Sequence, residues 1–271
     1  MSWFSKHWNA VFGRGESQSP PSPALTPVPA DRGGDAGSPR RESLVLVADG
    51  VGGFDLCGKS LAKVLKASGL PYTTRVLRWG HGVGRWYADL SNAANQDAWA
   101  DKVAEAVRRY HDANPGAAVF LVGKSGGCVV IVKALERLSG GDGGPVVDRA
   151  VLLAPALSPG YDLAPALENV RRDLVVYWSP LDVFILGAGT RIFGTSDRVF
   201  CSGAGRVGFL RPRAGDASPA RLALYKKLRQ IRWSARMSST GYLGGHLGTD
   251  SPRFLKKYVA PLLRVEPAAE C

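Results

Sequence analysis

The chain has 271 residues, of which 45% are hydrophobic and 21% charged, and its formal net charge is +12. This composition is ordinary for a globular protein and excludes wholesale disorder. No apolar run approaches the roughly 18–20 residues that span a bilayer. The four cysteines lie far apart, and no Cys or His cluster has the spacing of a zinc site. We therefore expect reduced thiols, no metal and a cytoplasmic protein.

Residues 1–42 differ from the rest of the chain. The segment 1–12 carries aromatic residues at helical spacing, and 17–41 is rich in Pro, Gly and Ser. The first segment lacks the basic start and apolar stretch of a secretory signal, and the second is typical of a solvated linker. We predict a flexible tail over 1–42 and one domain over 43–271. Three interpretations of the aromatic segment are open: it docks on the domain, it makes weak peripheral membrane contact, or it has no role.

From residue 43 onward, buried strand patterns alternate with helical patterns. The run LVLVA at 44–48 is apolar throughout, which is typical of a strand buried on both faces. Repeated strand-then-helix order predicts an α/β domain with a parallel sheet covered on both faces. Strands are expected over 44–48, 72–79, 117–122, 148–153, 174–178 and 231–234, and helices over 56–68, 96–111, 128–138, 221–229 and 252–263.

The sharpest local signal is the pentapeptide GKSGG at 123–127, which matches G-x-S-x-G between a predicted strand and a predicted helix. A serine on such a tight turn projects above the sheet, and the flanking positions favour glycine because larger side chains would collide. We interpret Ser125 as a nucleophile. A phosphate-binding loop is disfavoured because Ala118 stands where its first glycine is required. A purely structural turn is the remaining alternative.

A second glycine-rich segment, DGVGGF at 49–54, follows the first predicted strand. Acyl transfer needs two backbone N–H groups aimed at the developing oxyanion. Gly126 would supply one of these N–H groups and Val51 the other. Gly52, the neighbour of Val51, would lie at the substrate. An ordinary glycine-rich turn is also compatible with this segment. A dinucleotide site is not, because the third glycine of its motif is missing.

A general base and a carboxylate that orients it are expected after the serine. His246 lies between glycines in GGHLG, before the last predicted helix, so its loop can turn back over the sheet edge. His81 is the alternative base, although such a histidine more often lines the pocket or hydrogen-bonds locally. We predict that Asp182, which follows an apolar strand, is the carboxylate that orients the base. The alternative interpretation is that Asp182 caps a helix or lies in a solvated turn. Asp162 and Asp197 are lesser candidates.

The order Ser125, Asp182, His246, together with the glycine-rich first loop, resembles the α/β-hydrolase superfamily over residues 43–263. The resemblance implies a mostly parallel sheet of about eight strands and a Ser–His–Asp hydrolase of the esterase or lipase type. Two departures stand out. Asp49 occupies a position where many members carry histidine, and Lys124 places a cation beside the nucleophile. Lys124 either favours an anionic substrate or pairs with a nearby carboxylate, and we place it with Gly52 and His81 among the candidate substrate-binding residues.

We therefore predict a serine hydrolase that cleaves a carboxylic ester or related acyl bond of a small molecule, without metal or organic cofactor. The alternative is an inactive α/β-hydrolase-fold scaffold whose basic face binds an anionic partner or membrane. Residues 211–264 hold twelve Lys and Arg against two Asp. No known nucleic-acid motif accompanies this charge, so nucleic acid is not expected as a partner. A solvated basic surface is the simplest interpretation.

Overall fold

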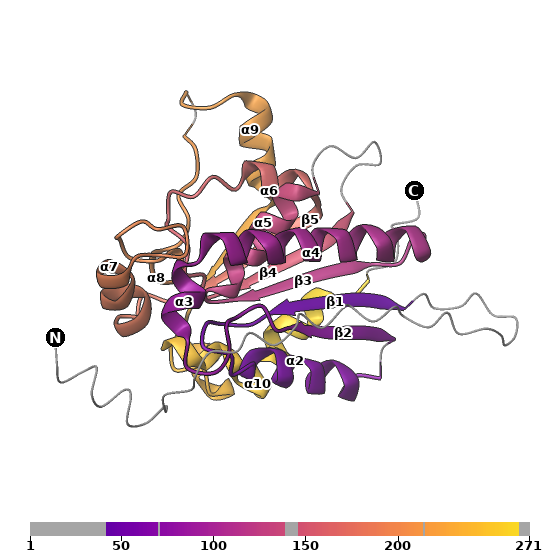
Figure 1. Ribbon diagram of the computed structural model, residues 1–271, viewed down its shortest axis with the longest axis horizontal. Helices are drawn as coiled ribbons and strands as arrows, with labels where there is room; N and C mark the ends of the chain where they lie inside the picture. The colour runs from indigo at the N-terminus through magenta and orange to yellow at the C-terminus, as the bar shows by residue number, and fades with distance from the viewer. Residues whose placement is uncertain (1–41, 70, 139–145, 214, 266–271) are drawn as a thin grey trace, which may run out of the picture.

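The computed structural model describes residues 42–69, 71–138, 146–213 and 215–265 (Figure 1). The predicted tail over 1–42 therefore lies outside the described residues except for Glu42. The described chain forms one six-stranded sheet in the order β2-β1-β3-β4-β5-β6, and every neighbouring pair is parallel. The strands are β1 Ser43–Ala48, β2 Tyr72–Leu77, β3 Val119–Lys124, β4 Val147–Leu153, β5 Val170–Trp178 and β6 Leu228–Arg232.

Alternate residues of β1 show how the two faces of the sheet are filled. Leu44, Leu46 and Ala48 belong to one hydrophobic cluster, whereas Val45 and Val47 belong to a second. Successive side chains of a strand point to opposite faces, so a strand buried on both faces is apolar at every position. The predicted α/β class is confirmed.

Helices cover both faces of the sheet, as Figure 1 shows. The first cluster joins the sheet to helices on one face, and the second joins it to α2 and the C-terminal helical segments on the other. The longer helices are α2 Leu56–Ala67, α4 Ala93–Ala113 and α5 Gly127–Arg137, and the shorter α-helices are α3 Trp86–Ser91, α6 Ala164–Glu168, α7 Thr190–Phe193, α8 Ala204–Val207, α9 Pro219–Leu224 and α10 Pro252–Phe254. The 3-10 and π segments are η1 Phe184–Gly189, η2 Tyr225–Lys227, η3 Ala235–Thr240, η4 His246–Asp250, η5 Leu255–Val259 and η6 Ala260–Leu263.

Three expectations need correction. Among the described residues the sheet has six strands instead of about eight, with β2 and β6 as its two edges. The helix predicted over 221–229 ends earlier, since Leu228 starts β6 and pairs with Leu174 of β5. The closing helix over 252–263 changes from α to π and then to 3-10 geometry around Pro261, which has no N–H to donate.

The parallel arrangement brings the loops after the strands to one edge of the sheet. In open α/β sheets, ligands bind at this carboxyl edge. Val51 follows β1, Ser125 follows β3, Asp182 follows β5 and His246 follows β6. No helix in the described part of the chain is long and apolar enough to cross a membrane.

Candidate active site

Ser125 sits on a strained turn between β3 and α5. Its φ is 51°, in the left-handed region that residues other than glycine rarely adopt. A Cβ on Gly123 would lie 2.8 Å from Cys128 Cα, and one on Gly127 would lie 2.3 Å from the Ala48 carbonyl oxygen. These contacts explain why the turn requires glycine on both sides of the serine. Ser125 N–H donates to the Leu153 carbonyl at 2.9 Å, which ties the turn to β4.

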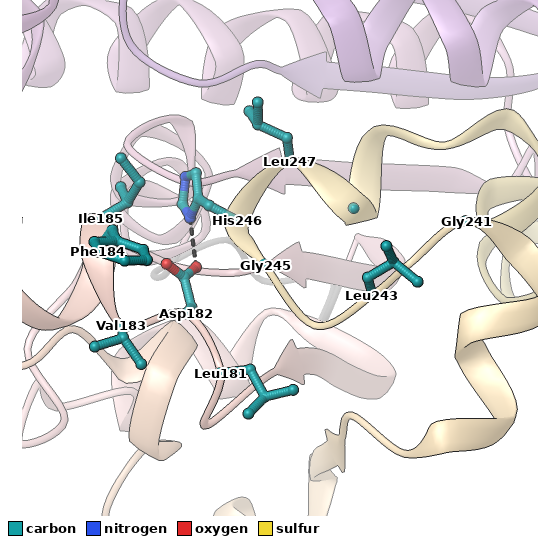
Figure 2. Close-up of a pocket in the computed structure, with 11 residues that line it drawn as sticks. Leu181, Asp182, Val183, Phe184, Ile185, Gly241, Leu243, Gly245, His246 and Leu247 are labelled. Carbon is teal, nitrogen blue, oxygen red and sulfur yellow. Dashed lines mark hydrogen bonds and ion pairs between the residues drawn. The ribbon is translucent and has the colours of Figure 1, made fainter.

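Ser125, His246 and Asp182 form a continuous hydrogen-bonded chain. His246 Nε2 lies 2.8 Å from Ser125 Oγ, and His246 Nδ1 lies 2.6 Å from Asp182 Oδ2. Figure 2 shows the carboxylate of Asp182 facing the imidazole. A carboxylate at Nδ1 keeps the proton of the neutral ring on that nitrogen, so Nε2 is left to accept the serine proton. Asp182 Oδ1 accepts the Leu186 N–H at 3.2 Å, which fixes the carboxylate on its loop.

The surroundings of His246 favour its neutral form. Burial lowers the pKa of the imidazole below its usual value, and the nearby Lys124 ammonium lowers it further. The carboxylate of Asp182 acts in the opposite direction but does not reverse the shift. A histidine that is neutral near pH 7 can accept a proton, as a general base must.

Lys124 does not take the substrate-contacting position that we expected. Its side chain is buried, with the residue only 2% exposed. Lys124 Nζ donates to the His246 carbonyl at 2.6 Å and lies 3.7 Å from Asp250 Oδ1. The second interpretation of this residue, pairing with a carboxylate, therefore describes the structure, and Asp250 is the partner that the sequence did not identify.

The loop after β1 is held by buried carboxylates at both ends. Asp49 accepts the N–H of Gly50 at 2.8 Å and that of Gly58 at 2.7 Å. Asp89 accepts the N–H of Gly52 at 2.7 Å, so this group is already occupied. Asp49 thus organises the loop after β1.

Two backbone N–H groups beside Ser125 differ from that of Gly52, because no carboxylate of the described residues accepts a hydrogen bond from them. Across the described residues, the N–H groups of Val51 and Gly126 donate to no protein acceptor. The two residues are also adjacent, because a Cβ on Gly126 would lie 2.5 Å from Val51 Cγ1. Unpaired N–H groups close to a nucleophile are what an oxyanion requires.

His81, the alternative base, lies in another network. Its Nδ1 is 2.9 Å from Asp89 Oδ1, its Nε2 is 3.1 Å from Asn92 Nδ2, and its own N–H donates to Asp89 at 2.6 Å. Gln96 Nε2 donates to the Asp89 carbonyl at 3.0 Å. His81 is thus joined through Asp89 to Gly52 and supports the loop after β1. The sequence did not identify Asp89, because Gly52, the residue through which it holds the loop, lies 37 positions away in the chain.

The lesser acid candidates are engaged elsewhere. Asp197 Oδ1 accepts the Ser158 N–H at 2.8 Å, and Asp162 Oδ1 lies 2.6 Å from an Arg221 nitrogen. Neither contacts His246. Asp182 is the carboxylate that the fold brings to the imidazole.

An apolar hollow of about 490 Å³ adjoins the imidazole of His246. Figure 2 shows side chains from the loop after β5 on one side of it and from the His246 loop on the other. Its apolar lining consists of Leu181, Val183, Phe184, Ile185, Leu243 and Leu247.

A parallel sheet with a serine elbow, followed along the chain by an aspartate and a histidine, is the architecture of the α/β-hydrolase fold. No protein-family model and no curated protein matches the sequence. Similar solved structures include a predicted CIB-like hydrolase from Thermoplasma acidophilum, with 15% identity, coverage of 84% of this chain and 88% of that chain, and a TM-score of 0.40. An acetylxylan esterase has 15% identity, coverage of 80% and 97%, and a TM-score of 0.40. A thioesterase domain from the curacin biosynthetic pathway has 12% identity, coverage of 84% and 92%, and a TM-score of 0.35.

Proposed function

We propose that the protein is a serine hydrolase that cleaves a carboxylic ester or related acyl bond through an acyl-enzyme. The observation that carries this proposal is the hydrogen-bonded chain from Asp182 through His246 to Ser125 Oγ. This series of hydrogen bonds ends at Ser125, beside the two unpaired N–H groups of Val51 and Gly126. This arrangement supports His246 as the base, Ser125 as the nucleophile and the two N–H groups as the place for negative charge.

In the first half of the reaction, Ser125 Oγ attacks the substrate carbonyl carbon while its proton passes to His246 Nε2. The carbonyl oxygen becomes negative and accepts hydrogen bonds from the N–H groups of Val51 and Gly126. The bond to the leaving group then breaks, and the proton on Nε2 passes to the departing oxygen. The acyl group is left on Ser125.

In the second half, water attacks the acyl carbon and gives its proton to His246 Nε2. The bond to Ser125 Oγ breaks, that oxygen takes the proton back, and the carboxylic acid leaves. Asp182 stays ionised throughout and stabilises the imidazolium that forms twice in each cycle. The α5 N-terminus next to Ser125 also favours the negative charge of each tetrahedral intermediate.

Hydrolysis of a short p-nitrophenyl ester tests the proposal. We expect turnover by the full chain and a loss of at least about 10³-fold in Ser125→Ala. Ser239→Ala is the matched control, because Ser239 is an exposed serine bonded only to its own helical turn. Equal activity in all three proteins would contradict the role of Ser125. No activity in any of them would favour the scaffold alternative, with the basic 211–264 region contacting a partner.

A further inference from the structure

Ser196 carries a buried hydroxyl group that the fold leaves without a partner. The residue is 2% exposed and lies in the segment between α7 and α8. Its Oγ makes no hydrogen bond to any described residue. A buried hydroxyl of this kind loses its hydrogen bonds to water and gains none in return, so such groups are rare in folded proteins. A ligand atom that accepts a hydrogen bond here would supply the missing partner.

The backbone holds Ser196 against the nucleophile turn. Ser196 N–H donates to the Ala156 carbonyl at 2.8 Å, and Ala156 N–H donates to the Ser125 carbonyl at 3.2 Å. Next to Ser196, Thr195 N–H donates to the Val199 carbonyl at 2.9 Å, which closes a tight turn. Two successive backbone hydrogen bonds therefore connect Ser196 to Ser125, although the two residues lie far apart in the sequence.

The Ser196 hydroxyl also lies beside Gly126, one of the two unpaired N–H donors. A Cβ on Gly126 would lie 3.8 Å from Ser196 Oγ and 2.5 Å from Val51 Cγ1. Gly126 has helical backbone angles, with φ −61° and ψ −29°, at the start of α5. In a helix the Cα–Cβ bond tilts toward the N-terminal end, where the unpaired N–H groups also point. Ser196 Oγ therefore lies at the same end of α5 as the Gly126 N–H.

Three donors without a protein acceptor among the described residues thus lie together beside Ser125: the N–H groups of Val51 and Gly126 and the hydroxyl of Ser196. A serine hydroxyl rotates about its C–O bond, so its proton can turn toward an atom that the two N–H groups hold in place. Ser125 is itself only 6% exposed, so an oxygen bound here is shielded from water and each hydrogen bond to it is strengthened. The negative oxygen of a tetrahedral intermediate accepts several hydrogen bonds at once in such a place.

We propose that Ser196 is a catalytic residue that donates a third hydrogen bond to the oxyanion. The inference rests on the proposed hydrolase function and adds a donor from the segment after β5 to the two predicted from the sequence. As Ser125 Oγ bonds to the carbonyl carbon, an electron pair of the double bond moves to the carbonyl oxygen and the serine proton passes to His246. That oxygen accepts the bond from Ser196, which keeps its own proton, until the double bond re-forms.

Ser196→Ala tests the proposal, because it removes the hydroxyl and little else. We expect kcat/KM for p-nitrophenyl butyrate to fall about 10- to 100-fold, as for the loss of an oxyanion donor. The melting temperature should not fall, because the hydroxyl has no partner in the free protein and its removal breaks no hydrogen bond. A residue with a purely structural role would lose stability instead.

Ser202→Ala is the matched control. Ser202 lies in the same segment and is also buried, but its Oγ lies 3.1 Å from a guanidinium nitrogen of Arg206, from which it accepts a hydrogen bond. Removing this hydroxyl leaves Arg206 without the acceptor, so the melting temperature should fall while kcat/KM stays close to that of the unmodified chain.

A trifluoromethyl ketone inhibitor reports on the negative oxygen itself. Ser125 adds to the ketone carbon and the ketone oxygen becomes negative, as in the tetrahedral intermediate. In Ser196→Ala, the Ki of the ketone should rise by about the factor by which kcat/KM falls. The Ki of the alcohol with the same carbon skeleton, which forms no oxyanion, should not change.

The outcomes separate the two proposals. No ester hydrolysis and no fluorophosphonate labelling of Ser125 in the unmodified chain would remove the hydrolase function itself, and the role of Ser196 with it. A normal kcat/KM in Ser196→Ala, with an active unmodified chain, would leave the hydrolase standing and overturn the role of Ser196. That role is also overturned if kcat/KM and the melting temperature fall together while the Ki of the ketone stays unchanged, because the hydroxyl would then only support the fold.

Discussion

Lys124 and His246 are joined by a hydrogen bond of 2.6 Å from the lysine ammonium to the histidine carbonyl oxygen. The residue before Ser125 thus holds the loop that carries His246, although 122 positions separate Lys124 and His246 in the sequence. Because Lys124 also lies beside Asp250, one buried cation connects the elbow after β3 to the 3-10 segment that begins at His246.

Removing this cation should shift the pH dependence of hydrolysis. The Lys124 ammonium lowers the pKa of His246, so Lys124→Met should raise it. Because only the neutral imidazole accepts the serine proton, the acid limb of kcat/KM should move to higher pH, and relative activity should fall most on that limb. A pH–rate profile measures this directly.

The control for this shift is Lys66→Met, which removes an exposed lysine on α2. An unchanged acid limb in Lys124→Met would contradict the electrostatic role of the cation. Lys124→Met should also lose about 1–3 kcal/mol of unfolding free energy, because the partly buried Asp250 is left without its charged partner. Activities are therefore compared at a temperature where both variants are folded.

Asp89 should matter for catalysis although it does not contact Ser125. It accepts hydrogen bonds from the Gly52 and His81 N–H groups, and these bonds fix the loop that presents Val51. We expect Asp89→Asn to lower kcat about 10- to 100-fold with a smaller change in KM, because a displaced oxyanion donor weakens the transition state more than substrate binding. Steady-state kinetics give both constants.

Asp112→Asn, at the exposed end of α4, is the control for a neutralised aspartate. A normal kcat in Asp89→Asn, with only a lower melting temperature, would show that the network around His81 is structural and that the loop after β1 does not depend on it.

The glycine after the nucleophile turn should not tolerate a methyl group. A Cβ on Gly127 would lie 2.3 Å from the carbonyl oxygens of both Ala48 and Asp49, so Gly127→Ala must displace backbone. We expect it to lower the unfolding free energy by about 1–3 kcal/mol and to reduce activity, because the start of α5 and the loop after β1 move apart. Denaturant unfolding and ester hydrolysis provide the two readouts.

Gly160→Ala offers the comparison, since a Cβ there meets nothing within 4 Å and its φ is not positive. It should be neutral or stabilise the fold by up to about 1 kcal/mol. Equal stability of the two variants would be inconsistent with the packing described at the elbow.

Asp182→Asn should retain the fold and lose most activity. An amide at this position can donate to Nδ1, which favours the wrong tautomer of His246 and leaves Nε2 unable to accept the serine proton. A loss of about 10³–10⁴-fold in kcat is expected for such a change. Asp197→Asn, which changes a carboxylate bonded to Ser158, should lose far less; similar losses in both variants would argue against the role of Asp182.

The sequence predicted those parts of the site that depend on local geometry. The glycines around Ser125 are required by contacts within a few residues of the turn and with the neighbouring strand, so the motif and its flanking elements were enough to identify the elbow. Asp182 and His246 were predicted from their positions after a strand and between glycines. The structure brings their side chains within hydrogen-bond distance of each other, and their catalytic roles stay predictions. Asp89 and Asp250 were missed because each acts on a residue that only the folded chain brings near.

The errors in the fold have similar causes. The segment 221–234 changes from helix to strand at Leu228, where pairing with β5 outweighs the local pattern. Lys124 was predicted to contact the substrate because a lysine next to a predicted nucleophile is expected to be an exposed cation. Its burial depends on Asp250 and on the backbone of His246, which no pattern near position 124 reveals.

Covalent labelling by a fluorophosphonate, followed by peptide mass spectrometry, tests the central claim most directly. The account predicts a single adduct on Ser125 in the full chain, with labelling much slower in His246→Ala because the serine then has no base. No adduct at Ser125, or one that forms equally fast without His246, would contradict the assignment of these residues as a catalytic unit.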